Sequence, residues 1–277
     1  MGHAVADVAR TFAANRSVGG IALAVRASAG VTRRSRVREE GPLRVRCPGP
    51  ASAELEAVIV NTAGGVAGGD RFTLGMTVEP EARLIVTTAA AEKVYRALAA
   101  QATIDVKLDV AAGGSLAWLP QETILFDRAR LKRTIDIDLA EDARLVLAEA
   151  IVFGRAGMGE TVDDSFLLDR WRLRRGGRLI HAEAMRLDGA VAARLARPAV
   201  AKGGIAVATV LVVPGDEGTA TGVRALGDRL RGEVGVSAWN GLAVVRFCAA
   251  DGEALRHDLV AVLAAVRGAS LPRLWLN

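Results

Sequence analysis

The sequence predicts an all-β fold of stacked strand layers, solenoid-like or β-helix-like, with two α-helices in the C-terminal half. Three observations predict it: many segments alternate between apolar and polar residues, one type of turn recurs along the chain, and helical periodicity appears only late. Alternation with a period of two is typical of half-buried strands, because successive side chains point to opposite faces of a sheet. No linker rich in proline, serine or glycine divides the 277 residues. We therefore expect a single domain over residues 1–277, with a flexible N-terminus over residues 1–20.

The alternation is clearest in two central segments. Thr103–Val110 places four apolar residues on one face and polar or charged residues on the other, and Thr134–Leu139 repeats the pattern. Such segments are typical of strands with one face on a core. Further strands are predicted at Ala57–Asn61, Phe72–Val78, Arg83–Thr88, Arg144–Phe153, Ala206–Val213 and Leu242–Phe247.

A recurring turn connects several of these segments. In each copy an apolar residue ends one strand, five turn-like residues follow, and a leucine opens the next strand; the copies start 32, 29 and 34 residues apart. Units of this size bury little alone and share an apolar interior when stacked, which favours a solenoidal arrangement with the turns along one edge. An antiparallel sandwich with regular turns explains the spacing equally well. The copies run Val78–Leu84, Val110–Leu116, Leu139–Leu145 and Leu173–Leu179.

Helices are predicted only after residue 215. Glu253–Arg267 carries a one-sided apolar stripe at helical spacing, with Asp251 placed to cap its first turn and Gly268 after its last turn. A second, shorter helix is predicted across Gly222–Arg231.

The charge of the chain bears on its partners. A net charge of +5 and a pI of about 9.8 at first suggest an anionic partner. However, the densest basic run, Arg33–Arg38, is followed at once by Glu39 and Glu40. Aromatic residues make up 4% of the chain, with a single tyrosine, so no platform for stacking bases is visible. We expect no nucleic-acid partner, and an arginine-rich module that binds anions or RNA remains an alternative.

The apolar runs and the cysteines of the sequence indicate the cellular compartment of the protein. The longest apolar run, Ile205–Val213, has nine residues, less than half of what a membrane-spanning helix needs. Asp7 and Arg10 interrupt the alanine-rich N-terminus, which lacks the apolar stretch of an export signal. Two cysteines cannot build a disulfide framework or a cysteine-rich zinc site. We expect a cytoplasmic protein with no membrane partner.

Common catalytic motifs are absent from the sequence. The glycine-rich stretch Gly64–Arg71 lacks the lysine and hydroxyl of a phosphate-binding loop, and neither a GxSxG elbow nor an HExxH pair occurs. The three histidines are scattered. The sequence therefore predicts no catalytic residues.

Acidic residues are the remaining candidates for a site. Asp70 follows the glycine-rich turn, Glu122 follows Trp118–Gln121, and Glu183 lies in the strand opened by Leu179. Glu149 lies within the apolar run Leu145–Phe153, where a carboxylate is costly unless it is paired, hydrogen-bonded or hydrated. Three interpretations of Glu149 follow: a buried salt bridge to an arginine, the lining of a wet channel or interface, or one half of a general acid–base pair.

Several segments, taken in order, are similar to motifs of the UreD urease accessory proteins, also called UreH. The most specific is Leu116–Ile124, which resembles the family pattern L-x-W-L-P-Q-E-x-I. In the glycine-rich stretch, Thr62-Ala63 stands where the family has two prolines, and Ala89-Ala90 replaces a Pro-Gly pair; these departures affect turn residues but no candidate ligand. The other matching segments are Glu40–Val45, Asn61–Asp70, Thr87–Arg96, Gly154-Arg155 with Gly159-Glu160, Leu187–Gly189 and Leu271–Trp275.

The resemblance implies a solenoid-like all-β protein with two helices and no catalytic activity of its own. Members of the family bind apo-urease together with a helical accessory protein of the UreF type and a nickel-binding GTPase of the UreG type, and the assembly passes nickel to urease. No cofactor is bound tightly, and Ni²⁺ is expected only in transit. Aligned by the motifs, the acids of the transient nickel path are Asp70, Glu149 and Glu183. Carboxylates and waters suit such a path because they hold a divalent ion weakly enough to release it.

A β-solenoid enzyme acting on carbohydrates is the alternative from a different class. Paired acids cleave glycosidic bonds in such enzymes. Their sites usually offer aromatic platforms for sugars, and the four tryptophans here are spread at positions 118, 171, 239 and 275. The sequence therefore favours the accessory-protein interpretation.

Overall fold

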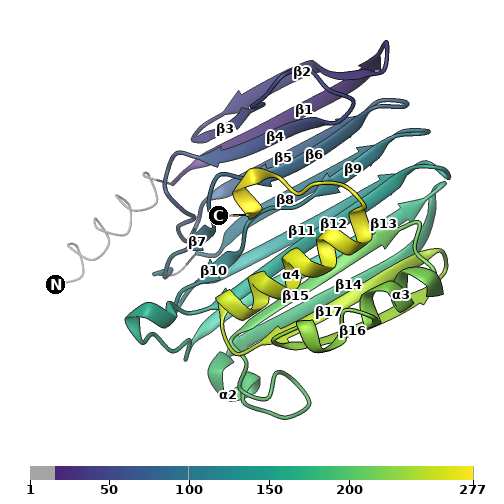
Figure 1. Ribbon diagram of the computed structural model, residues 1–277. Coiled ribbons are helices and arrows are strands. Elements are labelled where there is room, and N and C mark those ends of the chain that lie inside the picture. The colour runs from purple at the N-terminus through teal and green to yellow at the C-terminus, as the bar shows by residue number, and fades with distance from the viewer. Residues whose placement is uncertain (1–15, 99, 277) are drawn as a thin grey trace.

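The protein consists of two β-sheets packed face to face, with helices on the outer face of the second sheet, so that three layers form (Figure 1). A computed structural model describes residues 16–98 and 100–276. Within these residues no helix is long and apolar enough to cross a membrane.

The first sheet, sheet A, has seven strands in the order β14-β13-β11-β8-β5-β1-β2. Parallel strands form its centre, and an antiparallel strand closes each end. The strands of sheet A are β1 (Val18–Ser28), β2 (Val31–Glu40), β5 (Arg71–Val78), β8 (Ala102–Val110), β11 (Arg130–Leu139), β13 (Ser165–Arg175) and β14 (Arg178–Gly189).

The second sheet, sheet B, has ten strands, eight of them in the order β16-β17-β15-β12-β9-β6-β4-β3. The two short strands β7 and β10 pair with each other, and β10 also pairs with β12. The strands of sheet B are β3 (Leu43–Arg46), β4 (Leu55–Asn61), β6 (Arg83–Thr88), β7 (Glu92–Val94), β9 (Ser115–Trp118), β10 (Thr123–Leu125), β12 (Arg144–Phe153), β15 (Ala206–Val213), β16 (Glu233–Trp239) and β17 (Leu242–Ala249).

The centre of the molecule is a β-solenoid. In three successive coils the chain leaves sheet A, turns, and enters sheet B: β5 leads to β6, β8 to β9, and β11 to β12. The coils stack in register, with Val78 beside Val110 and Val110 beside Leu139. The turns stack as well, because the backbone N–H of Ala111 donates to Val78 O and that of Ala140 donates to Val110 O, both at 2.9 Å. The solenoid alternative from the sequence is therefore the correct one.

The fourth predicted turn stacks on the third but has a different geometry. The N–H of Gly176 donates to Leu139 O at 2.8 Å. However, Gly176 and Gly177 both have positive φ, 55° and 76°, the geometry of a two-residue hairpin turn. β13 therefore continues to Arg175 and returns antiparallel as β14 within sheet A. The prediction that this copy repeats the others, with a strand ending at Leu173, is wrong in this respect.

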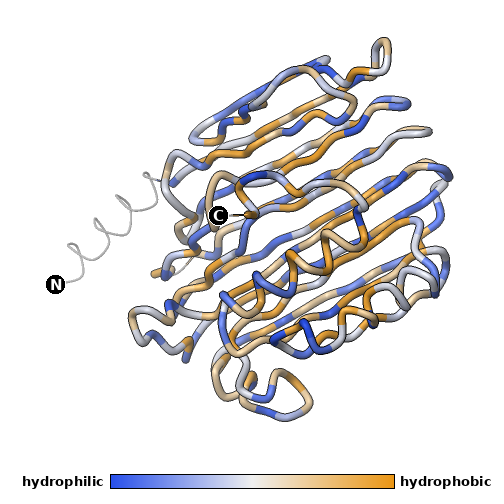
Figure 2. Tube along the Cα trace, viewed as in Figure 1, coloured by the Kyte–Doolittle hydropathy of each residue, from blue (hydrophilic) through white to orange (hydrophobic). Residues whose placement is uncertain are grey.

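The main core lies between the sheets. Consecutive coils contribute leucines that lie side by side in register: Leu84, Leu116 and Leu145 are each at most 1% exposed. Figure 2 shows the apolar residues alternating along the central strands. A second apolar cluster lies on the outer face of sheet B, under the helices. Sheet B is therefore buried on both faces over much of its area.

The two longest helices of the described residues both follow residue 215, as predicted. α4 (Gly252–Arg267) is capped by the Asp251 side chain, which accepts from the Ala254 N–H at 2.8 Å, and it ends at Gly268 with φ 59°. α3 (Glu217–Arg224) begins earlier than predicted, because Asp216 caps it. The predicted helix over Gly222–Arg231 is therefore displaced. The remaining helical segments are α2 (Val191–Leu195) and the 3₁₀ turns η1 (Ala156–Met158), η2 (Gly227–Arg229) and η3 (Arg273–Trp275).

The N-terminal part of sheet A was not predicted. The expected flexible N-terminus, residues 1–20, lies largely outside the described residues, but residues 18–20 belong to β1. β2 ends sheet A with eight consecutive exposed residues, 33–40. Apart from an isolated bridge between Thr32 and Ser52, no described strand pairs with its outer edge.

Candidate functional site

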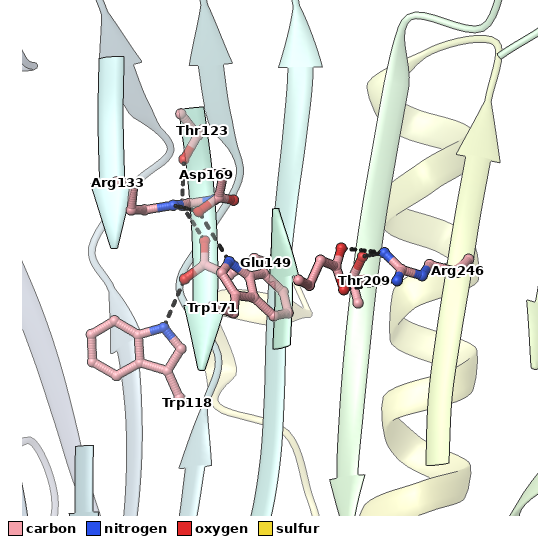
Figure 3. Close-up of polar contacts among 9 residues, drawn as sticks. Trp118, Thr123, Arg133, Glu149, Asp169, Trp171, Thr209 and Arg246 are labelled. Carbon is pink, nitrogen blue, oxygen red and sulfur yellow. Dashed lines mark hydrogen bonds and ion pairs between the residues drawn. The ribbon is translucent and has the colours of Figure 1, made fainter. Parts of the chain in front are cut away.

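A row of charged side chains crosses the interior between the two sheets (Figure 3). Arg133 lies on β11 between Leu131 and Ile135, which are both buried, so strand alternation points its side chain inward. Glu149 on β12 points into the same space from the opposite sheet, on the face that also carries Leu145 and Leu147. The face predicted for Glu149 is confirmed.

Arg133 binds two carboxylates at once. Its Nε donates to Asp169 Oδ1 at 3.0 Å and its Nη2 donates to Oδ2, while Nη1 donates to Glu149 Oε2. Arg133 and Asp169 are neighbours on sheet A, and Glu149 comes from sheet B. The side chains of all three are at most 6% exposed. The buried salt bridge proposed from the sequence is therefore present, with a second carboxylate that the sequence did not suggest.

Two tryptophans complete the hydrogen bonds of this cluster. Trp118 Nε1 donates to Glu149 Oε1 at 2.8 Å, and Trp171 Nε1 donates to Asp169 Oδ1 at 3.0 Å. Among the described residues, every buried side-chain nitrogen and oxygen has a hydrogen-bond partner. The polar groups of a buried cluster need such partners, because each unpaired donor or acceptor would lower the stability of the fold by about 1–3 kcal/mol.

The charges of the cluster do not balance. One guanidinium faces two carboxylates in a space from which water is largely removed. Burial raises the pKa of Glu149, Arg133 opposes this shift, and the nearby Asp169 raises the pKa further. The net effect is a pKa of Glu149 above its ordinary value.

The cluster forms one wall of a cavity of about 730 Å³ between β14 of sheet A and β15, β16 and β17 of sheet B. Glu183 on β14 and Arg246 on β17 lie on the same cavity. Arg246 Nη2 donates to Glu183 Oε2 at 2.7 Å, and Nη1 donates to Thr209 Oγ1 at 3.0 Å. The cavity therefore brings together two of the three predicted acids, Glu149 and Glu183.

Glu183 has a different environment from Glu149. Burial alone would raise its pKa, but hydrogen bonds from His181 and Arg246 outweigh burial and lower the pKa. His181 Nε2 lies 3.3 Å from Glu183 Oε2. Glu183 is thus held ionised at the open side of the cavity, while Glu149 lies deeper.

Asp70, the third predicted acid, is not among the residues that line this cavity. It is 3% exposed, and it accepts from the N–H of Ser17 at 2.9 Å and that of Ala67 at 2.8 Å. These bonds tie the glycine-rich turn to the start of β1. The charge of Asp70 acts on Glu92, whose pKa is raised to about 7, chiefly by burial, with Asn61 opposing the shift.

Glu122, another acid singled out in the sequence, lies on the opposite face of sheet B. Its Oε1 is 2.9 Å from Arg256 Nη1 on α4, and the same nitrogen donates to Gln121 Oε1 at 2.7 Å. Arg256 also lies over the ring of Trp275 at 5.2 Å, and Trp275 Nε1 donates to Leu119 O at 3.0 Å. The segments Leu116–Ile124 and Leu271–Trp275 therefore pack together, both through Arg256 of α4 and through the direct Trp275–Leu119 hydrogen bond.

The sequence interpretation missed Arg133, Asp169, Glu92 and Arg246. A signal existed for three of them. Arg133 and Asp169 both occupy the apolar phase of their strands, as Glu149 does, and the same parity argument would have identified them. Arg246 interrupts the apolar run Leu242–Ala249 in the phase of Leu242 and Val244, so it carries the same signal. Glu92 carries no such signal, because its strand has only three residues.

The side chains of the site determine whether it can bind a metal ion. Among the described residues no group of three or more His, Cys, Asp and Glu is arranged to hold a metal ion. Both oxygens of Glu149 accept hydrogen bonds, from Trp118 and Arg133, and both oxygens of Glu183 accept from Arg246. A cation that binds either carboxylate must therefore compete with an arginine.

Comparison with known proteins gives the family. The model of the UreD urease accessory protein family matches residues 17–276. A urease accessory protein UreD of Rhodopseudomonas palustris is 56% identical over 268 residues, covering 97% of this chain and 96% of the relative. One from Bradyrhizobium diazoefficiens is 56% identical over 266 residues, covering 96% of each chain, and the UreD 1 of a Bradyrhizobium species is 50% identical over 274 residues, covering 99% and 98%. The chain therefore belongs to the UreD urease accessory protein family.

Proposed function

We propose that this protein acts in the cytoplasm as a non-enzymatic scaffold in the complex that inserts nickel into apo-urease. Its partners in this proposal are apo-urease, a helical accessory protein of the UreF type and a nickel-binding GTPase of the UreG type. Membership of the UreD family supports the urease accessory role. Two free cysteines in the described residues, Cys47 and Cys248, fit a reducing compartment.

The observation that carries the nickel proposal is that Glu149 and Glu183 share one cavity between the sheets. The two acids lie on opposite sheets, each paired with an arginine from the other sheet: Arg133 reaches from sheet A to Glu149, and Arg246 reaches from sheet B to Glu183. We propose that Ni²⁺ passes along this row as cargo, with carboxylates exchanging an arginine for the cation. Oxygen donors release nickel more readily than a closed set of histidine and cysteine ligands would.

We include Asp70 in this path because polar side chains on neighbouring strands connect it to the Arg133 cluster. Its charge acts on Glu92 of β7, and Glu92 is the register partner of Thr123 on β10. Thr123 Oγ1 in turn lies 3.4 Å from Arg133 Nη1. These side chains form a polar sequence from Asp70 to the Arg133 cluster, which supports including Asp70 in the path.

The test is nickel loading of apo-urease in a reconstituted mixture with both other accessory proteins. We expect Glu149→Ala and Glu183→Ala to lower the nickel content of urease while leaving co-purification with the partners unchanged. Glu141→Ala is the control, because the Glu141 side chain is 79% exposed on a turn. Wild-type nickel content in both cavity variants would rule out the path, and turnover of nucleotides or glycans by the purified chain would contradict the non-enzymatic role.

A further inference from the structure

The recurring turns place a second set of polar residues side by side, outside the interior cavity. The first residues of β6, β9 and β12 are Arg83, Ser115 and Arg144. In the parallel ladder Ser115 is the register partner of both arginines. Each follows one of the stacked turns, so the solenoid repeat itself produces the row Arg-Ser-Arg.

These three side chains point away from the main core. The residues that follow them, Leu84, Leu116 and Leu145, are buried between the sheets, and alternation directs their predecessors to the outer face of sheet B. α4 packs on this face against β12, β15 and β17 (Figure 1). Arg83, Ser115 and Arg144 line a pocket of about 470 Å³ together with Arg267 near the end of α4.

The Arg267 side chain is held in place by contacts within the protein. Its side chain is only 4% exposed, and its Nη2 lies 2.8 and 3.0 Å from the two carboxylate oxygens of Glu54. Its Nη1 donates to Ser270 O at 2.6 Å. One guanidinium of the pocket is therefore fixed before any ligand arrives.

The protein neutralises only part of the charge of the pocket, because Glu54 pairs with Arg267 alone. Within residues 16–98 and 100–276, neither Arg83 nor Arg144 has an ion pair, and the Ser115 hydroxyl has no hydrogen bond. Glu54 is the one acid among the residues that line the pocket, so three guanidiniums and one carboxylate leave two net positive charges. Neighbouring strands are about 4.8 Å apart, so the two exposed arginines start about 10 Å from each other and can converge on one ligand.

We propose that this pocket, in which the unpaired guanidiniums of Arg83 and Arg144 flank Ser115 beside the Glu54-bound Arg267, binds an oxyanion that carries two negative charges, of the phosphate or dicarboxylate class. Guanidinium groups match the spacing of the oxygens in planar carboxylates and tetrahedral phosphates, and they form charge-assisted hydrogen bonds to them. Ser115, between the two exposed arginines, adds a hydroxyl donor. The site is separate from the nickel path, because it lies on the outer face of sheet B, and the proposal does not depend on that function.

The test is calorimetric titration of the full chain at constant ionic strength with inorganic phosphate, sulfate, glycerol 3-phosphate and succinate in separate experiments. We expect at least one of these anions to bind with a dissociation constant below about 10 mM. Removing charge-assisted hydrogen bonds typically weakens binding by about tenfold or more, so we expect that loss for Arg83→Ala/Arg144→Ala and a smaller loss for Ser115→Ala. Binding of phosphate and glycerol 3-phosphate without succinate would identify a phosphate group as the ligand, and the reverse a dicarboxylate.

The matched control is Arg170→Ala/Arg172→Ala, two exposed arginines on the outer face of sheet A. It should bind the anion as the wild type does, and thermal melting should show that both double variants are folded. No binding of any of the four anions, or equal weakening in the control, would overturn the proposal. Equal binding of chloride in a separate titration would do the same.

Discussion

Arg133 and Glu149 face each other from opposite sheets, and their contact is one of the two charged links that cross the interior of the described chain. Because Arg133 also holds Asp169, the two carboxylates of this cluster depend on one cation. The partners are therefore unequal: removing the arginine leaves two buried negative charges, whereas removing Glu149 leaves a balanced pair.

This inequality predicts an order of stability. Arg133→Ala should lower the free energy of unfolding by about 3–5 kcal/mol, the usual cost of leaving a buried charge without its partner. Glu149→Ala should cost less, about 1–3 kcal/mol, since it leaves the Trp118 N–H without an acceptor but no charge without a partner. Urea unfolding of the two variants measures the difference. Equal losses would contradict the proposed charge balance.

Glu92 predicts a pH dependence of stability. Its pKa is about 7 in the folded protein, against 4.5 as the ordinary value, so the folded chain binds more protons than the unfolded chain between these pH values. The free energy of unfolding should therefore fall as pH rises through this window, by at most about 3 kcal/mol. Glu92→Gln should remove this fall. Urea unfolding at about pH 5 and about pH 8 measures it.

The control for this prediction is Glu141→Gln, which replaces an exposed carboxyl. It should retain the wild-type difference between the two pH values. A Glu92→Gln variant whose stability falls with pH as steeply as that of the wild type would show that another group titrates.

Gly41 and Gly30 predict different costs for the same substitution. Both have positive φ, 60° and 75°, so alanine carries a backbone cost of about 1–2 kcal/mol at either position. At Gly41 a Cβ atom would lie 2.0 Å from the carbonyl oxygen of Val18, whereas at Gly30 nothing lies within 4 Å. Gly41→Ala should therefore melt well below Gly30→Ala in thermal unfolding. Equal melting temperatures would mean that the Gly41–Val18 contact relaxes freely.

The contacts of Arg256 predict that this residue holds the C-terminal segment, residues 270–276, in place. Arg256→Ala removes contacts to Gln121, Glu122 and the carbonyl of Leu274, and it should destabilise the protein by about 2–3 kcal/mol. Hydrogen exchange should rise in residues 270–276, where Trp275 is 1% exposed. Arg273→Ala, an exposed arginine of the same segment, is the control and should leave exchange near the wild-type rate. Unchanged exchange in both variants would mean that burial of Trp275 alone holds the segment.

Local patterns predicted the regular elements well. The predicted strands Arg83–Thr88, Arg144–Phe153 and Ala206–Val213 have the observed bounds, because their apolar residues recur with a clear boundary at each end. β2 was missed because it buries almost no side chain and so has no apolar phase. The fourth turn was assigned to the wrong class because two glycines permit a hairpin, which spacing alone does not reveal.

The candidate site was predictable only in part. The apolar neighbours of Glu149 indicated a buried acid, but not which of many arginines pairs with it. That pairing depends on the stagger between the two sheets. The stagger brings Arg133 next to Glu149, which is 16 residues away in the sequence, and Arg246 next to Glu183, which is 63 residues away. No local periodicity encodes this stagger.

The arginines of β2 have a consequence for self-association. Among the described residues only the Thr32–Ser52 bridge covers the outer edge of β2. An exposed strand edge can be extended by a strand from another copy, which promotes aggregation. Arg33, Arg36 and Arg38 lie among the exposed residues of β2. A second β2 pairing antiparallel to the first would bring these arginines against one another, and like charges on facing strands repel. The resistance of this end of the molecule to aggregation should therefore weaken as salt screens the repulsion.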